Sequence, residues 1–255
     1  MLMENNMDQS AQYGQMNFNL PHDVVQLPSK GKFYRNRKKS IKVGYLTAAD
    51  ENILLAGNTR EGLMTTLLRN KIYEPDIRPE ELLNGDVEAI MIFLRNTSFG
   101  PSYKITTTDP ETGKEFTSEI LLTELYLKES TVEPNEDGLF ETKLPKSGVN
   151  VKLKPLTMGD GLEIDRIIDS YPLGRVAPRQ TLRLSKMIVD IEGNTDREQI
   201  TKFIEGMPIM DSKHIRNFMM ENEPRLDLRQ RIITPSGKEI VMDILFGAEF
   251  FRPFF

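Results

Sequence analysis

A short segment that occurs twice places the strongest constraint on how this chain can fold. Residues 27–31 read Leu-Pro-Ser-Lys-Gly, and residues 144–148 read Leu-Pro-Lys-Ser-Gly. In the first copy a basic loop comes next, and a strand-like stretch follows it at residues 41–45. In the second copy the strand-like stretch at residues 149–154 follows directly. Because Pro and Gly favour turns and β-branched residues favour strands, each copy predicts a turn followed by a strand.

The two copies also share a helix start. Thr47 precedes Asp50 by three residues, and Thr157 precedes Asp160 at the same spacing. At this spacing a threonine can cap the helix, while the acidic residue binds free N–H groups and opposes the helix dipole. Each copy therefore predicts a turn, a strand and a capped helix.

Agreement between the two copies continues further along the chain. Asp86 and Asp211 each open a stretch with apolar residues at helical spacing. Gly113 and Gly237, which lie nearly as far apart in the sequence, each sit between two strand-like arms that predict a β-hairpin. These matches indicate an internal duplication.

The sequence thus predicts an α+β fold of two tandem, internally duplicated halves, each with strands, short helices and a β-hairpin. We assign residues 1–24 to a mobile N-terminal arm, because its sequence lacks helical or strand periodicity. The first half spans residues 25–132, and the second spans residues 133–255 and ends in a Phe-rich C-terminus. The middle helices of the second half are predicted at residues 161–169, 178–189 and 195–205.

Composition excludes several classes of protein. A mean hydropathy of −0.41 and 28% charged residues fit no lipid-buried chain, and no run approaches the roughly 18 apolar residues of a membrane span. The first residues lack a secretory signal pattern, so we expect the protein to stay in the compartment where it is made. With no Cys and only His22 and His214, we expect no metal site and no cofactor.

Catalytic motifs are also missing from the sequence. It contains no phosphate-binding glycine loop, no dinucleotide-binding glycine pattern, no nucleophile elbow and no zinc-protease motif. Two carboxylate pairs occur, Glu163 with Asp165 and Asp109 with Glu111, but neither has the spacing that places both on one helical face. We interpret both pairs as solvated and predict that the protein is not an enzyme.

A basic run follows the first turn. Between residues 30 and 42 the chain carries many cations and no acidic residue. Such a run can contact phosphate, but a solvated hairpin tip or an acidic protein partner explains it equally well. The candidate partner-binding residues in it are Lys30, Lys32, Arg35, Arg37, Lys38 and Lys39. Nucleic-acid binding through residues 30–42 stays the alternative function.

The C-terminus carries a second candidate surface. Phe250, Phe251, Phe254 and Phe255 crowd the last residues of the chain. Exposed aromatic surface is costly in water, so these rings either fold back onto the second hairpin or bind a partner. Self-burial is favoured because it needs no second molecule.

Four segments give the chain a resemblance to a known family. They are residues 27–34 (LPSKGKFY), 46–51 (LTAADE), 93–100 (FLRNTSFG) and 250–253 (FFRP). They resemble the baseplate proteins of contractile-tailed, T-even-like bacteriophages, and the likeness covers residues 25–255. The resemblance implies a non-enzymatic part in building the baseplate hub, as a hub subunit or an assembly factor that contacts other hub proteins. It implies a location in the host cytoplasm during assembly, and in the virion if the chain stays in the tail.

Some members of that family carry Cys-x-x-Cys pairs at the positions of the two hairpin tips. Here those positions read Thr-Thr-Asp-Pro at residues 107–110 and Thr-Pro-Ser-Gly at residues 234–237. The resemblance therefore implies that the hairpins persist without zinc, and metal binding does not carry over to this chain.

Overall fold

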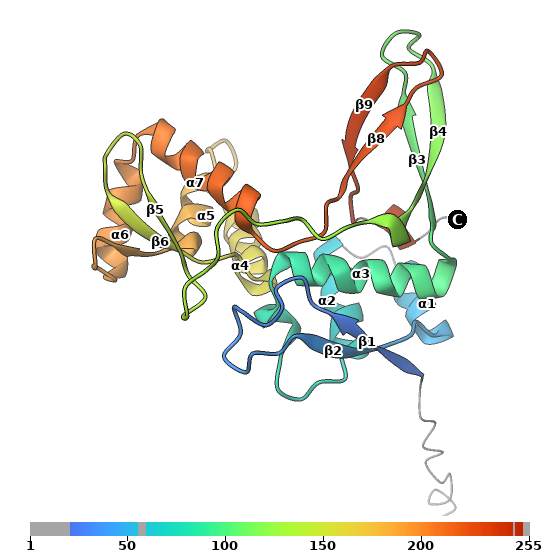
Figure 1. Ribbon diagram of the computed structural model, residues 1–255, viewed down its shortest axis with the longest axis horizontal. Helices are drawn as coiled ribbons and strands as arrows, with labels where there is room; N and C mark the ends of the chain where they lie inside the picture. The colour runs from blue at the N-terminus through green and yellow to red at the C-terminus, as the bar shows by residue number, and fades with distance from the viewer. Residues whose placement is uncertain (1–20, 56–59, 247, 252–255) are drawn as a thin grey trace, which may run out of the picture.

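The structure is a computed structural model that describes residues 21–55, 60–246 and 248–251 (Figure 1). Its helices are α1 (Ala48–Leu55), α2 (Arg60–Lys71), α3 (Asn84–Phe99), α4 (Met158–Asp169), α5 (Arg179–Met187), α6 (Arg197–Glu205) and α7 (Ile209–Asn222), with 3-10 turns η1 (Pro79–Glu81), η2 (Leu122–Glu124) and η3 (Ala248–Phe251). Its strands are β1 (His22–Gln26), β2 (Ser40–Gly44), β3 (Ser102–Thr108), β4 (Glu115–Leu121), β5 (Phe140–Lys143), β6 (Asn150–Leu153), β7 (Ile188–Ile191), β8 (Arg229–Ile233) and β9 (Glu239–Asp243). The fold is α+β, as predicted.

The strands form small antiparallel sheets. β1 pairs with β2, β3 with β4 and β8 with β9, while β5, β6 and β7 form a three-stranded sheet. Both predicted hairpins are present, with Gly113 and Gly237 in their tips at positive φ. Figure 1 shows these two hairpins standing side by side above α3. The internal duplication itself stays a prediction.

Two predicted elements were wrong. Residues 22–24, which we assigned to the mobile arm, begin β1, because they pair with β2 along the register from His22–Gly44 to Gln26–Ser40. Residues 1–20 of that arm lie outside the described residues. The predicted helix at residues 178–189 ends at Met187, and the chain continues as β7. The β-branched residues Ile188, Val189 and Ile191 favour a strand here, where β6 offers a pairing edge.

Both predicted helix starts are stabilised by their Thr–Asp pairs. At α4, Asp160 N donates to Thr157 Oγ1 (3.1 Å) and Thr157 N donates to Asp160 Oδ2 (3.2 Å), which forms a capping box. At α1, Thr47 N donates to Asp50 Oδ2 (2.7 Å). Asp50 is also ion-paired with Lys71 of α2, and both side chains are buried. The pair therefore ties α1 to α2.

A buried carboxylate at the start of α3 holds the first Leu-Pro-Ser-Lys-Gly turn. Ser29 N donates to Asp86 Oδ1 (2.9 Å), and Tyr34 Oη donates to Asp86 Oδ2. Leu83 N in turn donates to Tyr34 Oη (3.0 Å). Burial raises the pKa of the Asp86 carboxyl, against the hydrogen bonds from Ser29 and Tyr34, which lower it. We call this contact between a turn and a helix start the turn clasp.

A second turn clasp involves the Leu-Pro-Lys-Ser-Gly turn at residues 144–148. Lys146 N donates to Asp211 Oδ1 (2.7 Å) and Ser147 N donates to Asp211 Oδ2 (3.0 Å) at the start of α7. Burial acts to raise the pKa of Asp211, but the hydrogen bonds from Lys146 and Ser147 outweigh it and lower that pKa. Two turns of similar sequence thus each bind a carboxylate at the start of a helix.

Two buried clusters form the cores. The first surrounds α3 and includes β1, β2, α2 and the C-terminal residues Phe246, Phe250 and Phe251. The second lies among β5–β7 and α5–α7. The first cluster also contains Leu228 and Ile244, which flank the second hairpin. The cores therefore cross the division at residues 132 and 133, and the assignment of two folding units stays a prediction.

The C-terminal turn η3 is anchored on α3. Arg95, which is only 1% exposed, donates from Nε to the carbonyl of Phe250 (2.9 Å) and from Nη1 to the carbonyl of Gly100 (2.8 Å). The Phe250 ring packs on Tyr103 of β3 at 5.3 Å between centroids. The C-terminal rings thus cover α3 and the base of the first hairpin, which is a wider burial than the predicted packing on the second hairpin alone.

The hairpin tips are joined by one carboxylate. Asp109 accepts hydrogen bonds from Ser236 N (3.1 Å) and Ser236 Oγ (3.0 Å) across the two hairpins, and from Glu111 N (2.9 Å) in its own tip. We interpreted Asp109 as solvated, and this was wrong, because the side chain is 1% exposed between the tips. A polar contact joins the two tips at the positions where the resemblance places cysteines.

The buried ring of Phe250 gives a stability prediction. Phe250→Ala should lower the free energy of unfolding by about 3–5 kcal/mol, because it leaves a cavity between α3 and β3. Leu245→Ala, at a side chain that is 68% exposed, is the matched control and should change stability little. Chemical denaturation of the full chain measures both. Equal stability of the two variants would contradict the described packing.

The Asp211 clasp gives a pH prediction. Because the folded state lowers the pKa of Asp211, its contribution is complete above the ordinary carboxyl pKa near 4 and is lost as the pH falls through the lowered value. Asp211→Asn should therefore lower the free energy of unfolding by about 1–3 kcal/mol at pH 7. The difference in this free energy between the variant and wild type should become smaller below about pH 4. Glu221→Gln, at an exposed position of the same helix, is the control. A gap that stays constant with pH would contradict the assigned role.

Candidate functional site

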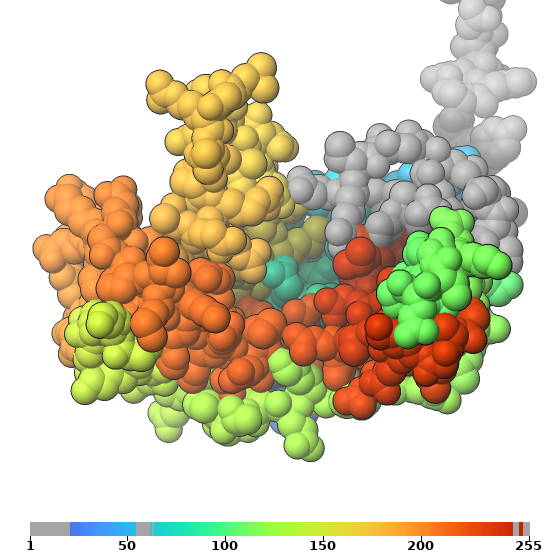
Figure 2. All heavy atoms as spheres, turned by 90° about the horizontal axis from the view of Figure 1, so that it is seen from above, coloured from blue at the N-terminus to red at the C-terminus, as the bar shows by residue number. Residues whose placement is uncertain are grey.

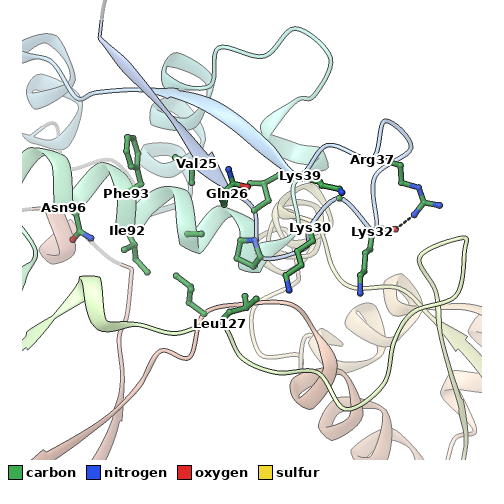
Figure 3. Close-up of a pocket in the computed structure, with 15 residues that line it drawn as sticks. Val25, Gln26, Lys30, Lys32, Arg37, Lys39, Ile92, Phe93, Asn96 and Leu127 are labelled. Atoms are coloured by element: carbon green, nitrogen blue, oxygen red, sulfur yellow. Dashed lines mark hydrogen bonds between the residues drawn. The ribbon is translucent and has the colours of Figure 1, made fainter.

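An open groove of about 1120 Å³ runs along one face of α3 (Figure 3). It is bounded by β1 and the turn that follows it on one side, and by two crossing segments at Leu127 and Leu226 on the other. The residues that line it are Val25, Gln26, Leu27, Pro28, Lys30, Gly31, Lys32, Arg37, Lys39, Ala89, Ile92, Phe93, Asn96, Leu127 and Leu226. Most of this lining is apolar.

The floor of the groove is one stripe of α3. Ala89, Ile92, Phe93 and Asn96 follow the i, i+3, i+4, i+7 spacing that puts side chains on one helical face. Ala89 and Ile92 are almost fully buried and Phe93 is half-buried. Only a narrow part of this side-chain stripe therefore reaches the surface, where it forms the floor of the groove. Asn96 closes one end, and its side-chain oxygen is buried without a hydrogen-bond partner in the described part of the chain. A buried acceptor without a partner is uncommon in folded proteins.

The far wall is fixed by backbone hydrogen bonds. Leu127 and Leu226 form an isolated antiparallel bridge. Lys128 N donates to the carbonyl of Arg225 and Asp227 N donates to the carbonyl of Tyr126, each at 2.9 Å. Two segments far apart in sequence are thus locked together opposite β1, so both walls of the groove are held in place.

The other end of the groove is basic. Lys30, Lys32, Arg37 and Lys39 line this end, and no carboxylate is among the lining residues. Lys32 is ion-paired with Glu133, and Arg37 donates to two backbone carbonyls. Lys30 and Lys39 are exposed and make no salt bridge with any described residue. The groove therefore presents an apolar floor with unneutralised positive charge at one end.

The remaining residues of the basic run lie beside this end. Lys38 is ion-paired with Glu74 and Asp76 at 2.5 Å each, and its side chain is only 16% exposed. Burial acts to lower the pKa of Lys38, but the hydrogen bonds to Asp76 and Glu74 outweigh it and raise that pKa. Arg35 is exposed and makes no salt bridge with the described residues. Some cations of residues 30–42 thus take part in contacts within the fold, and others make no salt bridge with a described residue.

The predicted aromatic site residues are in a different place. Phe250 and Phe251 are 0% and 1% exposed in the first core, on the α3 side away from solvent. Phe254 and Phe255 lie outside the described residues. In this structure the two described rings stabilise the chain itself, which corresponds to the self-burial alternative.

The described residues assemble little that resembles a reaction centre. Among residues 21–55, 60–246 and 248–251, no group of three or more His, Asp or Glu side chains could hold a metal ion. Glu163 and Asp165 make separate surface salt bridges, with Lys186 and Arg179, at 2.6 Å each. The buried Asp86 is committed to its turn clasp. What the groove can do chemically is bind an apolar, negatively charged segment.

Sequence reasoning missed two surfaces. The groove was hidden because its floor residues also look like a core face of α3. The second surface is the loop at residues 170–178 between α4 and α5, which stands out from the body in gold in Figure 2. Leu173 and Val176 in this loop are 103% and 94% exposed. A signal for it was present, since Pro and Gly residues at 172, 174 and 178 interrupt the predicted helices there.

Residues 21–252 match the model of a family described as T4 bacteriophage base plate protein, which is well over half of the chain. Neither the curated proteins nor the solved structures contain a match. None of the described helices has the length and apolar character to span a membrane.

The divided roles within the basic run can be tested by charge reversal. Lys38→Glu should destabilise the fold by about 1 kcal/mol or more, because it puts a third carboxylate beside Glu74 and Asp76 in a half-buried position. Arg35→Glu, at an exposed residue of the same loop, should leave the melting temperature near that of wild type. If both variants melt like wild type, the ion pairs of Lys38 do not stabilise the fold, and the assigned role is wrong.

Proposed function

The chain belongs to the family of T4 bacteriophage base plate proteins, and we propose that it takes part in assembly of the baseplate hub, as a hub subunit or as an assembly factor. It acts without catalysis, through contacts with other baseplate hub proteins. It works in the host cytoplasm during assembly, and it remains in the virion if it is a subunit. The observation that carries this proposal is the open groove on α3, apolar on its floor and basic at one end.

The groove suits a protein partner better than a small molecule. Its floor is a narrow strip of an already packed core, open along its length, whereas ligand pockets usually enclose most of their ligand. Apolar surface that stays open in a folded chain commonly marks a protein contact. The positive end adds selectivity, because charge complementarity favours one class of partner and repels another.

The protruding loop at residues 170–178 supports the same function. Tyr171, Leu173 and Val176 expose apolar side chains on a segment that stands away from both cores. Such side chains gain free energy when they enter a partner's pocket, at roughly 25 cal/mol per Å² of apolar area buried. The groove and the loop offer two separate contact points, as expected of a chain that joins several neighbours.

Nucleic-acid binding through residues 30–42 is the alternative function. It is less favoured because Lys32 and Lys38 are committed to carboxylates of this chain, and Arg37 to backbone carbonyls. This leaves fewer cations to replace counterions on a phosphate backbone. DNA binding that weakens steeply as salt rises, with the slope of several phosphate contacts, would favour the alternative.

Complementation tests the proposal. In cells infected with a phage that lacks this chain, hubs should fail to form, and wild-type protein supplied in trans should restore them. Leu173→Asp/Val176→Asp should melt like wild type, because both side chains are exposed, and should restore at least tenfold fewer hubs. Sedimentation of hub intermediates measures the yield, with Glu198→Gln as the exposed control. Normal hubs without the chain would overturn the proposal.

A further inference from the structure

The small sheet of β1 and β2 has one closed edge and one open edge. Beyond β2 lies the segment at residues 72–74: Tyr73 N donates to the carbonyl of Lys42 (2.9 Å), and Lys42 N donates to Glu74 Oε1 (3.0 Å). Val43 and Ile72 form an antiparallel bridge on the same side. Within the described residues β1 has only β2 as a neighbour. Proteins usually cover or charge such an edge, because its backbone groups can pair with another chain.

The register identifies the backbone groups that face outward from β1. Leu27 N donates to the carbonyl of Lys39 (2.8 Å), and Tyr45 N donates to the carbonyl of Pro21 (3.2 Å). These bonds mark residues 21 and 27 as positions that face β2, and antiparallel pairing alternates with a period of two. Val24 and Gln26 therefore direct their N–H and C=O groups away from β2. Val24 is 56% exposed, and Gln26 is exposed too.

The open edge borders the groove. Val25, Gln26 and Leu27 line it, together with the α3 stripe of Ile92 and Phe93 (Figure 3). A strand added to β1 would lie about 4.8 Å from it, and alternate side chains of that strand would point toward the groove floor. A single site thus offers backbone pairing and an apolar floor side by side.

The charges at the groove define the chemistry of the occupant. All charged residues that line it are cations, and they gather beyond the end of β1. Lys30 and Lys39 are the exposed pair there without a salt bridge to a described residue. A segment that continues past Gln26 reaches them, so carboxylates at that end would be stabilised, while Lys or Arg there would be repelled.

We propose that an extended segment of another baseplate protein binds here by adding a strand to β1. Its backbone pairs with Val24 and Gln26, its apolar side chains lie on the α3 stripe, and its carboxylates contact Lys30 and Lys39. This mode of binding draws affinity from main-chain hydrogen bonds and selectivity from the side-chain pattern. The inference rests on the proposed function, and it specifies the class of partner that the groove takes.

A single substitution can remove one of the outward backbone donors of β1, the N–H of Val24. Val24→Pro deletes an outward N–H, while the β1–β2 hydrogen bonds, which use the alternate residues, stay intact. Proline is tolerated on edge strands whose N–H faces away from the sheet. Val24→Ala is the matched control, because it shortens the side chain and keeps the N–H.

Site-specific photo-crosslinking tests the proposal. A photoreactive amino acid replaces Gln26 in the full chain, which is supplied in trans to infected cells, and the crosslinked peptide is identified by mass spectrometry. We expect a crosslink to a carboxylate-containing segment of another baseplate protein. Lys30→Glu/Lys39→Glu and Val24→Pro should each reduce its yield at least tenfold. Lys114→Glu/Lys238→Glu, which reverses two exposed hairpin-tip charges, and Val24→Ala should leave it unchanged.

Several outcomes would overturn the proposal. They are a crosslink to residues 1–20 of the same chain, a crosslink to a second copy of this chain, no crosslink, or a crosslink that the lysine reversals do not change. Melting curves show whether Val24→Pro is folded, and if it is not, the lysine reversal alone decides. If hubs require the chain but form normally with folded Lys30→Glu/Lys39→Glu, this inference fails while the proposed function stands. If hubs do not require the chain, the proposed function fails first.

Discussion

The rest of the structure depends on a carboxylate at the start of a helix that binds the N–H groups of a turn. Asp86 of α3 binds Ser29, and Asp211 of α7 binds Lys146 and Ser147. Each turn is thereby fixed at the start of a helix, α3 or α7. The groove exists because the first clasp sets the turn after β1 beside the largely buried apolar stripe of α3.

The same contact is built in two electrostatic environments. Asp86 is buried and accepts a hydrogen bond from Tyr34, and this burial raises the pKa of its carboxyl group. Asp211 accepts two backbone N–H groups, and these outweigh its burial and lower its pKa. Both carboxylates accept hydrogen bonds, so the difference lies in the balance: at Asp86 the cost of burying the charge outweighs the hydrogen bonds, and at Asp211 the hydrogen bonds outweigh burial. The Asp211 clasp is therefore the one whose contribution to stability is lost in acid. The stability of the Asp86 clasp depends more on the burial of the residues that form it.

Sequence reasoning reached the parts of the fold that depend on local signals. The Thr–Asp helix starts, the helices that Asp86 and Asp211 open, and both hairpins follow from spacing and turn chemistry. It missed β1 and β7, because short strands form only where a distant strand pairs with them. It found the basic residues of the candidate site but not the groove, since Leu127 and Leu226 approach β1 only through tertiary pairing. For the same reason, no local pattern could show that Asp109 meets Ser236.

Hydrogen exchange tests most directly whether this protein acts in the baseplate through its groove. Amide exchange of the full chain would be followed alone and after co-assembly with other baseplate proteins. Slower exchange at residues 24–32 and 89–96, with unchanged exchange in α6, which belongs to the second core and does not line the groove, is the result that a bound segment beside β1 predicts. Unchanged exchange at residues 24–32 in the assembled complex would contradict that account.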